Sequence, residues 1–262
     1  MQRIGFLGAG NMAYAIAGAV SENIDDVVIV PFDIAPDRIR LFVDSFTSVE
    51  PAASVNELGE LSDILFLSVK PQMMKDAIAS LSGYDGLVVS IAAGLKIAFF
   101  EELMPAARIV RVMPNTPCLV GEMAAGFSAG KSVTADDLAV TEKLLKAAGT
   151  AVLVKEELID AVTGISGSGP AYFARLAEAF IEAGTASGLA PELSRELALQ
   201  TMKGTAALLQ QKDMSPEELV KMVSSPNGTT VAGREILEAS EYKDIIGRTV
   251  ARTIERSKEL GK

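Results

Sequence analysis

The sequence predicts an α/β N-terminal part, built on a doubly wound parallel sheet, followed by an all-α C-terminal part. A glycine-rich turn joins a short apolar strand at Ile4–Leu7 to an Ala-rich helix at Asn11–Val20. Apolar and β-branched runs then alternate with helical segments up to about residue 156, and no such run follows. We therefore expect two domains, at residues 1–156 and 157–262.

The glycine-rich turn has the pattern that a dinucleotide pyrophosphate requires. Gly8 permits the tight turn, Gly10 lets the backbone approach the phosphates, and Ala13 lets the helix pack closely on the strand. The helix N-terminus adds unpaired N–H groups and the positive end of its dipole. An ordinary strand–turn–helix connection would look similar, but the position of the turn between these two elements favours a Rossmann-type cofactor site.

Further strands are expected at regular intervals along the first domain. They are Val27–Val30, Asp63–Val69, Leu87–Ile91, Arg108–Met113 and, after a helix at Ala135–Ala148, Val152–Val154. Small or Pro-rich turns follow these strands, as is typical of a parallel sheet whose ligands bind at the carboxyl ends of its strands. The loops after Leu7, Val30, Val69, Ile91 and Met113 should therefore line one crevice.

The second domain is predicted to be helical throughout. Its helices are Asp160–Gly188 (interrupted at Gly164 and at Ser166–Pro170), Pro191–Gln211, Pro216–Met222, Thr230–Ser240 and Tyr242–Gly261. Small residues such as Ala174, Ala177 and Gly184 would let helices approach closely. So rich an apolar face in a small helical unit suggests that it packs against a second copy of the chain.

Composition excludes several classes of function. The net charge of −10 and the absence of a Lys/Arg-rich segment argue against a nucleic-acid-binding protein. We see no membrane-spanning apolar run and no export signal, and the single Cys118 fits a reducing, cytoplasmic setting. The chain has no histidine, which removes His-based acid/base catalysis, His-activated nucleophiles and almost every zinc site, so no metal site is predicted.

Two residues after the second strand point to different cofactors. Asp33 is placed to hydrogen-bond the adenosine ribose, which disfavours a 2′-phosphate, whereas Arg38 could bind that phosphate. A solvated surface pair is a third interpretation. The sequence leaves the choice between NADH and NADPH open.

Five motifs follow the glycine-rich turn in a fixed order. They are Lys70–Gln72, Ser90–Gly94, Met113–Pro117, Ser166–Tyr172 and Ser225–Thr230. Together they closely resemble the pyrroline-5-carboxylate reductases, over nearly the whole chain. The resemblance implies an N-terminal Rossmann domain, a C-terminal helical dimerisation domain that interlocks with a partner's, an active site at the dimer interface, and assembly into decamers in some members.

The resemblance also assigns residues to the cofactor and the substrate. The pyrophosphate would be held by Leu7, Gly8, Ala9, Gly10, Asn11 and Met12, and Ala35 and Asn56 would lie near the adenosine ribose. Ser68, Val69, Lys70, Pro71, Ala92, Ala93, Met113, Pro114 and Asn115 would border the nicotinamide. The backbone of Ser225, Gly228 and Thr229 would bind the substrate carboxylate, and the Thr230 hydroxyl would bind the ring nitrogen.

The local sequence supports the predicted substrate loop, Ser225–Thr230, which differs from the family at one position. Gly228 leads into a helix, whose free N–H groups suit a carboxylate, although Asn-Gly is also a common turn and Thr230 could be an ordinary N-cap. The family usually has two glycines where this chain has Asn227-Gly228. Asn tolerates a positive φ, so the loop should keep its shape.

The implied reaction is hydride transfer from NADPH or NADH to the C=N carbon of 1-pyrroline-5-carboxylate, which gives L-proline. A protonated imine is a good hydride acceptor, so a histidine-free chain can catalyse this step, with Thr230 positioning the nitrogen. NADPH is the commoner donor in the family, which tips the expectation toward it. Cys118 could be a catalytic thiol, but with no histidine to activate it a packed, inert cysteine is favoured. Lys70 could be a proton donor, but a loop-shaping or phosphate-facing role is favoured. The rival functions are reduction of another cyclic imine or a hydroxy acid, and non-catalytic nucleotide sensing.

Overall fold

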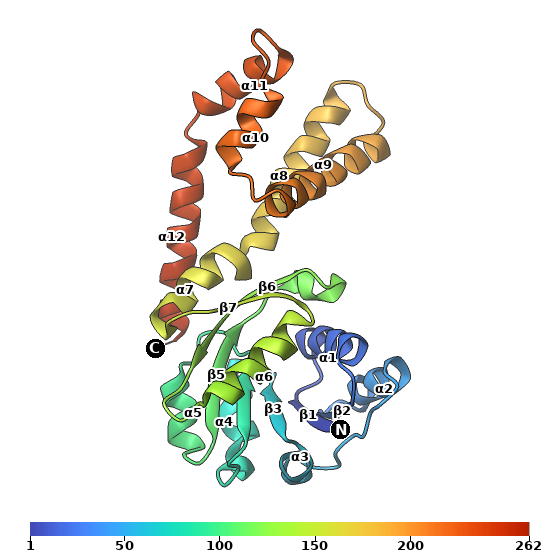
Figure 1. Ribbon diagram of the computed structural model, residues 1–262, viewed down its shortest axis with the longest axis vertical. Coiled ribbons are helices and arrows are strands. Elements are labelled where there is room, and N and C mark those ends of the chain that lie inside the picture. The colour runs from blue at the N-terminus through green and yellow to red at the C-terminus, as the bar shows by residue number, and fades with distance from the viewer. Residues whose placement is uncertain (262) are drawn as a thin grey trace. The chain divides into compact units, whose positions relative to one another are not determined.

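A computed structural model describes residues 1–261, and the chain divides into two compact units. The first comprises Met1–Pro170 together with the C-terminal residues from Ala251 onward, and the second is Ala171–Val250 (Figure 1). The domain limit expected after residue 156 was based on where strand-like segments end in the sequence, and it remains a prediction. The two units are described separately below.

The first unit is built on a seven-stranded sheet with the order β2-β1-β3-β4-β5-β6-β7. Its strands are β1 (Gln2–Leu7), β2 (Val27–Phe32), β3 (Ile64–Leu67), β4 (Leu87–Ser90), β5 (Arg108–Met113), β6 (Met123–Ala129) and β7 (Gly149–Leu153). The first five strands are parallel to one another, as predicted. β6 pairs with β5 in antiparallel fashion, and β7 follows β6 in parallel, so the last two strands run in the opposite direction.

Two expectations about the sheet are corrected by these last strands. The sequence analysis missed β6, and it placed the closing strand at Val152–Val154, whereas β7 covers Gly149–Leu153. β6 has the sequence MAAGFSA, in which alanine, glycine and serine lack the β-branched character that marks strands. Tertiary pairing with β5 and β7, and not local propensity, therefore determines this strand.

Helices cover both faces of the sheet (Figure 1). They are α1 (Asn11–Asn23), α2 (Pro36–Ser45), α3 (Val55–Leu61), α4 (Met74–Ala77), α5 (Ile97–Leu103), α6 (Ala135–Lys146) and α7 (Ile159–Val162). Successive residues of a strand face opposite sides, so Phe66 joins the cluster under α1 and α6, while Leu65 and Leu67 join the cluster under α4 and α5. Burial on both faces explains why the parallel strands are continuous apolar runs.

A stacked pair of phenylalanine rings in the core gives a stability prediction. Phe6 and Phe66 are fully buried on adjacent strands, and their rings stack with centroids 4.9 Å apart. Phe66→Ala should lower the free energy of unfolding by about 3–5 kcal/mol, because it removes a large apolar group and leaves a cavity. Val43→Ala, at a position of α2 that is 47% exposed, should change it by about 0.5 kcal/mol or less. Chemical denaturation monitored by circular dichroism would measure both, and equal values would contradict this account of the core.

The second unit is helical. α8 (Gly169–Ala186) leads into it, α9 (Pro191–Gln211), α10 (Pro216–Val223) and α11 (Thr229–Glu238) follow, and α12 (Tyr242–Leu260) returns the chain to the first unit. The predicted interruption before α8 is a turn of π-helix at Thr163–Gly167. A groove between α8 and α9 is lined by apolar side chains, among them Phe173, Leu176 and Phe180. Within residues 1–261, the helices are all too short or too polar to cross a membrane.

Candidate active site

The carboxyl ends of the first five strands carry most of the predicted cofactor residues. Backbone hydrogen bonds continue between the strands at this edge: Gly8 N–H donates to Phe32 O (2.8 Å), Ser68 N–H to Leu7 O (2.8 Å) and Ile91 N–H to Leu67 O (3.1 Å). The loops after β1, β2, β3, β4 and β5 therefore share one edge of the sheet, as predicted.

The two glycines of the turn have different structural roles. Gly8 has φ +94°, and a Cβ there would lie 2.9 Å from Val69 Cγ1 and 3.0 Å from the backbone of Ser68, so only glycine fits. Gly10 has φ −70°, and nothing lies within 4 Å of the position that its Cβ would take. The space beside Gly10 is therefore not needed by the protein itself, which is what close approach of a phosphate requires.

The start of α1 is open to an anion. Gly10 is the N-cap, and in the described structure no side chain caps it, so the first-turn N–H groups of Asn11 and Met12 are left for a ligand. Nearby, the buried Oγ of Ser68 has no hydrogen-bond partner within residues 1–261. An uncapped helix start and an orphaned hydroxyl on adjacent loops fit a polar group bound at this edge. The residues present therefore suit a dinucleotide cofactor.

The side chains of Asp33 and Arg38 both form hydrogen bonds with the glycine-rich turn. The carboxylate of Asp33 accepts hydrogen bonds from Ala9 N–H (2.7 Å) and Ala35 N–H (2.9 Å). Arg38 Nε donates to Ala9 O (2.7 Å), and its Nη2 donates to Asn11 Oδ1 (3.2 Å). The two side chains are therefore not a solvated surface pair, because both are committed to the same peptide segment.

The predicted nicotinamide-side residues differ in how far they are exposed. Asn115 is buried: its Nδ2 donates to Ser166 O (3.0 Å) and its Oδ1 accepts from Ala124 N–H (2.9 Å). The side chain of Asn115 therefore ties its loop to the π-helix and to β6, and sequence reasoning did not foresee this role. A Cβ at Gly167 would lie 2.5 Å from Met113 Cε, so Met113 also packs on the π-helix.

The other predicted residues line the same edge or lie beside it. Pro114 and Ala92 are buried, while Ala93 and Lys70 are exposed and Pro71 opens a short 3₁₀ turn. Ala35 is the N-cap of α2. Asn56 is exposed in the first turn of α3, and no hydrogen bond within residues 1–261 joins its side chain to the other predicted residues.

The Ser225–Thr230 loop belongs to the second unit. Asn227 has φ +59°, as expected for a residue that replaces glycine, and Gly228 is the N-cap of α11 without a side-chain cap. Gly228 N–H closes a turn onto Ser225 O (2.9 Å), and a Cβ on Gly228 would lie 2.5 Å from Ser225 Oγ. α11 begins at Thr229, one residue earlier than predicted, and the N–H groups of Thr229 and Thr230 have no acceptor within residues 1–261. Unpaired N–H groups at a helix start are the arrangement that can accept an anion.

Cys118 is not equipped to be a nucleophile. Its side chain is 2% exposed, and burial raises the pKa of the thiol to about 11. The raised pKa keeps the thiol protonated at neutral pH, and a protonated thiol is a poor nucleophile. The structure agrees with an inert, packed cysteine.

The fold and the site define a class. A Rossmann-type sheet with a glycine-rich turn, followed by a helical unit, describes a dinucleotide-dependent oxidoreductase. Two family models match the chain: "NADP oxidoreductase coenzyme F420-dependent" over residues 3–94, and "Pyrroline-5-carboxylate reductase dimerisation" over residues 156–260.

Full-length relatives identify the family. The chain is 39% identical to a pyrroline-5-carboxylate reductase of Methanosarcina acetivorans, covering 100% of this chain and 98% of the relative. It is 37% identical to that of Synechocystis sp., covering 99% and 98%. The crystal structure of the Plasmodium falciparum pyrroline carboxylate reductase with NADP bound matches with a TM-score of 0.86 and 31% identity, over 100% of this chain and 98% of that one. A Coxiella burnetii pyrroline-5-carboxylate reductase matches with a TM-score of 0.93 and 30% identity, over 99% and 98%. The chain belongs to the pyrroline-5-carboxylate reductase family and is an oxidoreductase.

Proposed function

We propose that the chain reduces 1-pyrroline-5-carboxylate to L-proline with NADPH or NADH as hydride donor. One observation carries the proposal: a chain of this family has both an open glycine-rich turn at Gly10 and an uncapped helix start at Thr229. The first fits a dinucleotide and the second fits a substrate carboxylate. Neither needs a histidine.

The cofactor would lie along the carboxyl edge of β1–β5. The turn Leu7–Met12 would hold the pyrophosphate, while Ala35 and Asn56 would lie near the adenosine ribose. The loops Ser68–Pro71, Ala92-Ala93 and Met113–Asn115 would border the nicotinamide, and Ser68 Oγ is a polar group there without a partner in residues 1–261. When bound, the nicotinamide supplies a hydride from its C4 atom.

The substrate would be oriented by the start of α11. The N–H groups of Thr229 and Thr230 would bind its carboxylate, and the Thr230 hydroxyl would bind the ring nitrogen. In this conformation the N–H of Gly228 is bonded to Ser225 O, so the backbone of Ser225 and Gly228 would contribute mainly by shaping the loop. Fixing both ends of the ring presents one face of the C=N bond to the hydride donor.

We also propose a preference for NADPH, which is supported by the hydrogen bonds of Asp33 and Arg38. Both carboxylate oxygens of Asp33 already accept backbone N–H groups, whereas Nη1 of Arg38 has no partner within residues 1–261. Arg38→Ala should therefore lower kcat/KM for NADPH about tenfold more than for NADH, the size of one lost charge-assisted contact to a 2′-phosphate. Initial rates with each cofactor would measure the ratio.

Asp33→Asn is the matched control for this prediction. It preserves the size of the side chain but places an amide where Ala9 N–H or Ala35 N–H needs an acceptor. It should raise KM for both cofactors by a similar factor, because it acts on the turn and not on the 2′-position. A selective gain in NADPH use by Asp33→Asn would instead assign the discrimination to Asp33.

The assembly is proposed to be a homodimer formed through the C-terminal helices. The groove between α8 and α9 leaves Phe173 60% and Phe180 68% exposed, which is unusual for large apolar side chains with no partner. Phe180→Glu should shift the protein toward monomer in light scattering, whereas Val43→Glu, at an exposed position of α2 in the first unit, should leave the assembly unchanged. Light scattering would also detect a decamer, the larger assembly that such dimers could form.

The single buried Cys118 supports a cytoplasmic location.

The reaction is tested with purified protein. Oxidation of NADPH and NADH is followed with and without 1-pyrroline-5-carboxylate, and proline is quantified as product. We expect substrate-dependent oxidation with one proline per cofactor. Cofactor binding without turnover of this substrate would overturn the proposal and direct attention to other cyclic imines.

A further inference from the structure

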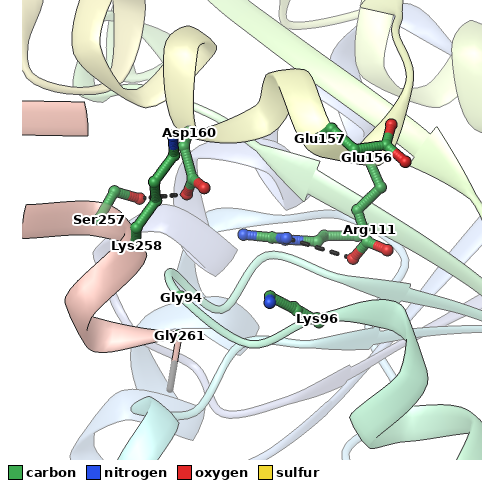
Figure 2. A pocket seen from close by; sticks show the side chains of 9 residues that line it. All are labelled: Gly94, Lys96, Arg111, Glu156, Glu157, Asp160, Ser257, Lys258 and Gly261. Carbon is green, nitrogen blue, oxygen red and sulfur yellow. Dashed lines mark hydrogen bonds and ion pairs between the residues drawn. The ribbon is translucent and has the colours of Figure 1, made fainter. Parts of the chain in front are cut away.

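One pocket of the first unit is lined by none of the residues of the glycine-rich turn. It has a volume of about 510 Å³, and its walls come from the loop after β4, the middle of β5, the turn before α7 and the last turns of α12 (Figure 2). All these segments belong to one compact unit. This volume is within the range of small-molecule sites. None of the residues assigned to the cofactor or the substrate lines this pocket.

One wall of the pocket is a buried guanidinium with spare donors. Arg111 projects from β5, and its side chain is only 6% exposed. Its Nη1 donates to Glu156 Oε1 (3.2 Å), an oxygen that also accepts Ile97 N–H (2.7 Å). Nε and Nη2 of Arg111 have no acceptor within residues 1–261. These two donors are not among the solvent-inaccessible atoms of the described residues, so they are accessible from the pocket and can bind an incoming carboxylate. Lys96 adds a second positive charge on the same side (Figure 2).

The opposite wall offers a carboxylate with a spare oxygen. Asp160 accepts the hydroxyl of the buried Ser257 at Oδ1 (2.6 Å), and within residues 1–261 its Oδ2 has no partner. Arg111 forms its ion pair with Glu156 and none with Asp160, although both side chains face the pocket (Figure 2). Glu157 and Lys258, which are exposed, carry opposite charges at the rim. Glu156 beside Arg111 and Lys258 beside Ser257 add a charge of the opposite sign at each wall. What the pocket offers to a ligand is therefore its unpaired polar atoms, the Nε and Nη2 donors of Arg111 on one side and Oδ2 of Asp160 on the other.

We propose that this pocket binds a zwitterionic small molecule of the free α-amino acid class. The carboxylate of the ligand binds Arg111 and Lys96, and its ammonium group binds Oδ2 of Asp160. Asp160 lies in α7, shortly before the chain leaves the first unit, and Ser257 lies in α12, shortly after the chain returns. A bound ligand therefore adds to the Ser257–Asp160 hydrogen bond and to the packing of the last residues of α12 on Gly94 within the first unit. The proposal does not depend on the proposed reaction.

The test uses the minimal zwitterion and its two halves as probes. Glycine, acetate and methylammonium are titrated into the full-length protein by calorimetry, without cofactor. We expect glycine to bind at least about tenfold more tightly than either half, because it gains charge-assisted contacts at both walls. Glycine should also raise the melting temperature.

Two variants identify the pocket while leaving the core intact. Asp160→Asn retains an oxygen to accept the Ser257 hydroxyl, and should weaken glycine about tenfold or more while leaving acetate unchanged. Lys96→Ala, at an exposed position, should weaken both glycine and acetate. Arg111 is left unchanged because its burial makes a folding defect the expected result of its removal. The proposal would be overturned if glycine bound no more tightly than acetate, or if Asp160→Asn left the affinity for glycine unchanged. An unchanged affinity in Asp160→Asn is the result expected if glycine binds instead at the start of α11.

Discussion

Gly10→Val is expected to weaken the binding of NADPH and NADH by about a hundredfold or more while leaving the protein folded. Gly10 has φ −70° and ψ 178°, an extended conformation that valine adopts readily. Nothing lies within 4 Å of its Cβ direction, so the protein alone accommodates the new side chain. The valine methyl groups would instead fill the space in which the proposed pyrophosphate approaches the start of α1, and would separate the phosphates from its N–H groups.

Gly8→Val provides the contrast that makes this result informative. Gly8 needs φ +94°, and its Cβ would collide with Val69 and with the backbone of Ser68. That variant should lose stability, whereas Gly10→Val should lose about 1 kcal/mol at most, from a poorer N-cap. Cofactor titration by fluorescence and thermal melting of both variants separates the two effects. Unchanged cofactor affinity in a folded Gly10→Val protein would remove the turn from the site.

Thr230→Ala is expected to lower kcat/KM for 1-pyrroline-5-carboxylate by roughly ten- to a thousandfold, the scale of one lost positioning hydrogen bond. Thr230 is exposed in the first turn of α11, so removing its hydroxyl should cost little stability. The backbone N–H remains in the variant, so the carboxylate contact is preserved and the loss reports on the hydroxyl. Cofactor affinity should not change.

Thr230→Ser is the control for this variant. It keeps the hydroxyl and removes only a methyl group, so it should recover most of the activity lost in Thr230→Ala. Steady-state kinetics of the three proteins at several substrate concentrations gives kcat and KM separately. Equal kinetics for Thr230→Ala and the unchanged protein would exclude Thr230 from substrate positioning.

The parallel part of the fold could be predicted because each strand is buried on both faces. β2 and β3 are runs of apolar and β-branched residues, and their type and order were read correctly from the sequence. β6 could not be predicted, because its small residues carry no strand signal of their own and it is stabilised by pairing with β5 and β7. For the same reason β7 was placed too late: its first residues, from Gly149, resemble a turn.

The candidate site was predictable where backbone conformation determines the residue type. The glycine at position 8 and the positive φ at Asn227 are examples, since few residues tolerate such conformations. Side-chain partners were not predictable in this way. The placement of Asp33 near a ribose stays a prediction, and its hydrogen bonds to Ala9 and Ala35 were not foreseen. The amide of Asn115 bonds to segments up to 51 residues away. Such partners depend on how loops meet in space, and a local pattern does not contain that information.

Transfer of an isotopic label tests the central claim most directly. Purified protein is given 1-pyrroline-5-carboxylate and NADPH that carries deuterium in place of both hydrogens at nicotinamide C4. Hydride transfer to the C=N carbon predicts proline with one deuterium at ring carbon C5, detected by mass spectrometry and NMR. Proline that forms without deuterium, or cofactor that binds while no proline forms, would contradict the proposed reaction.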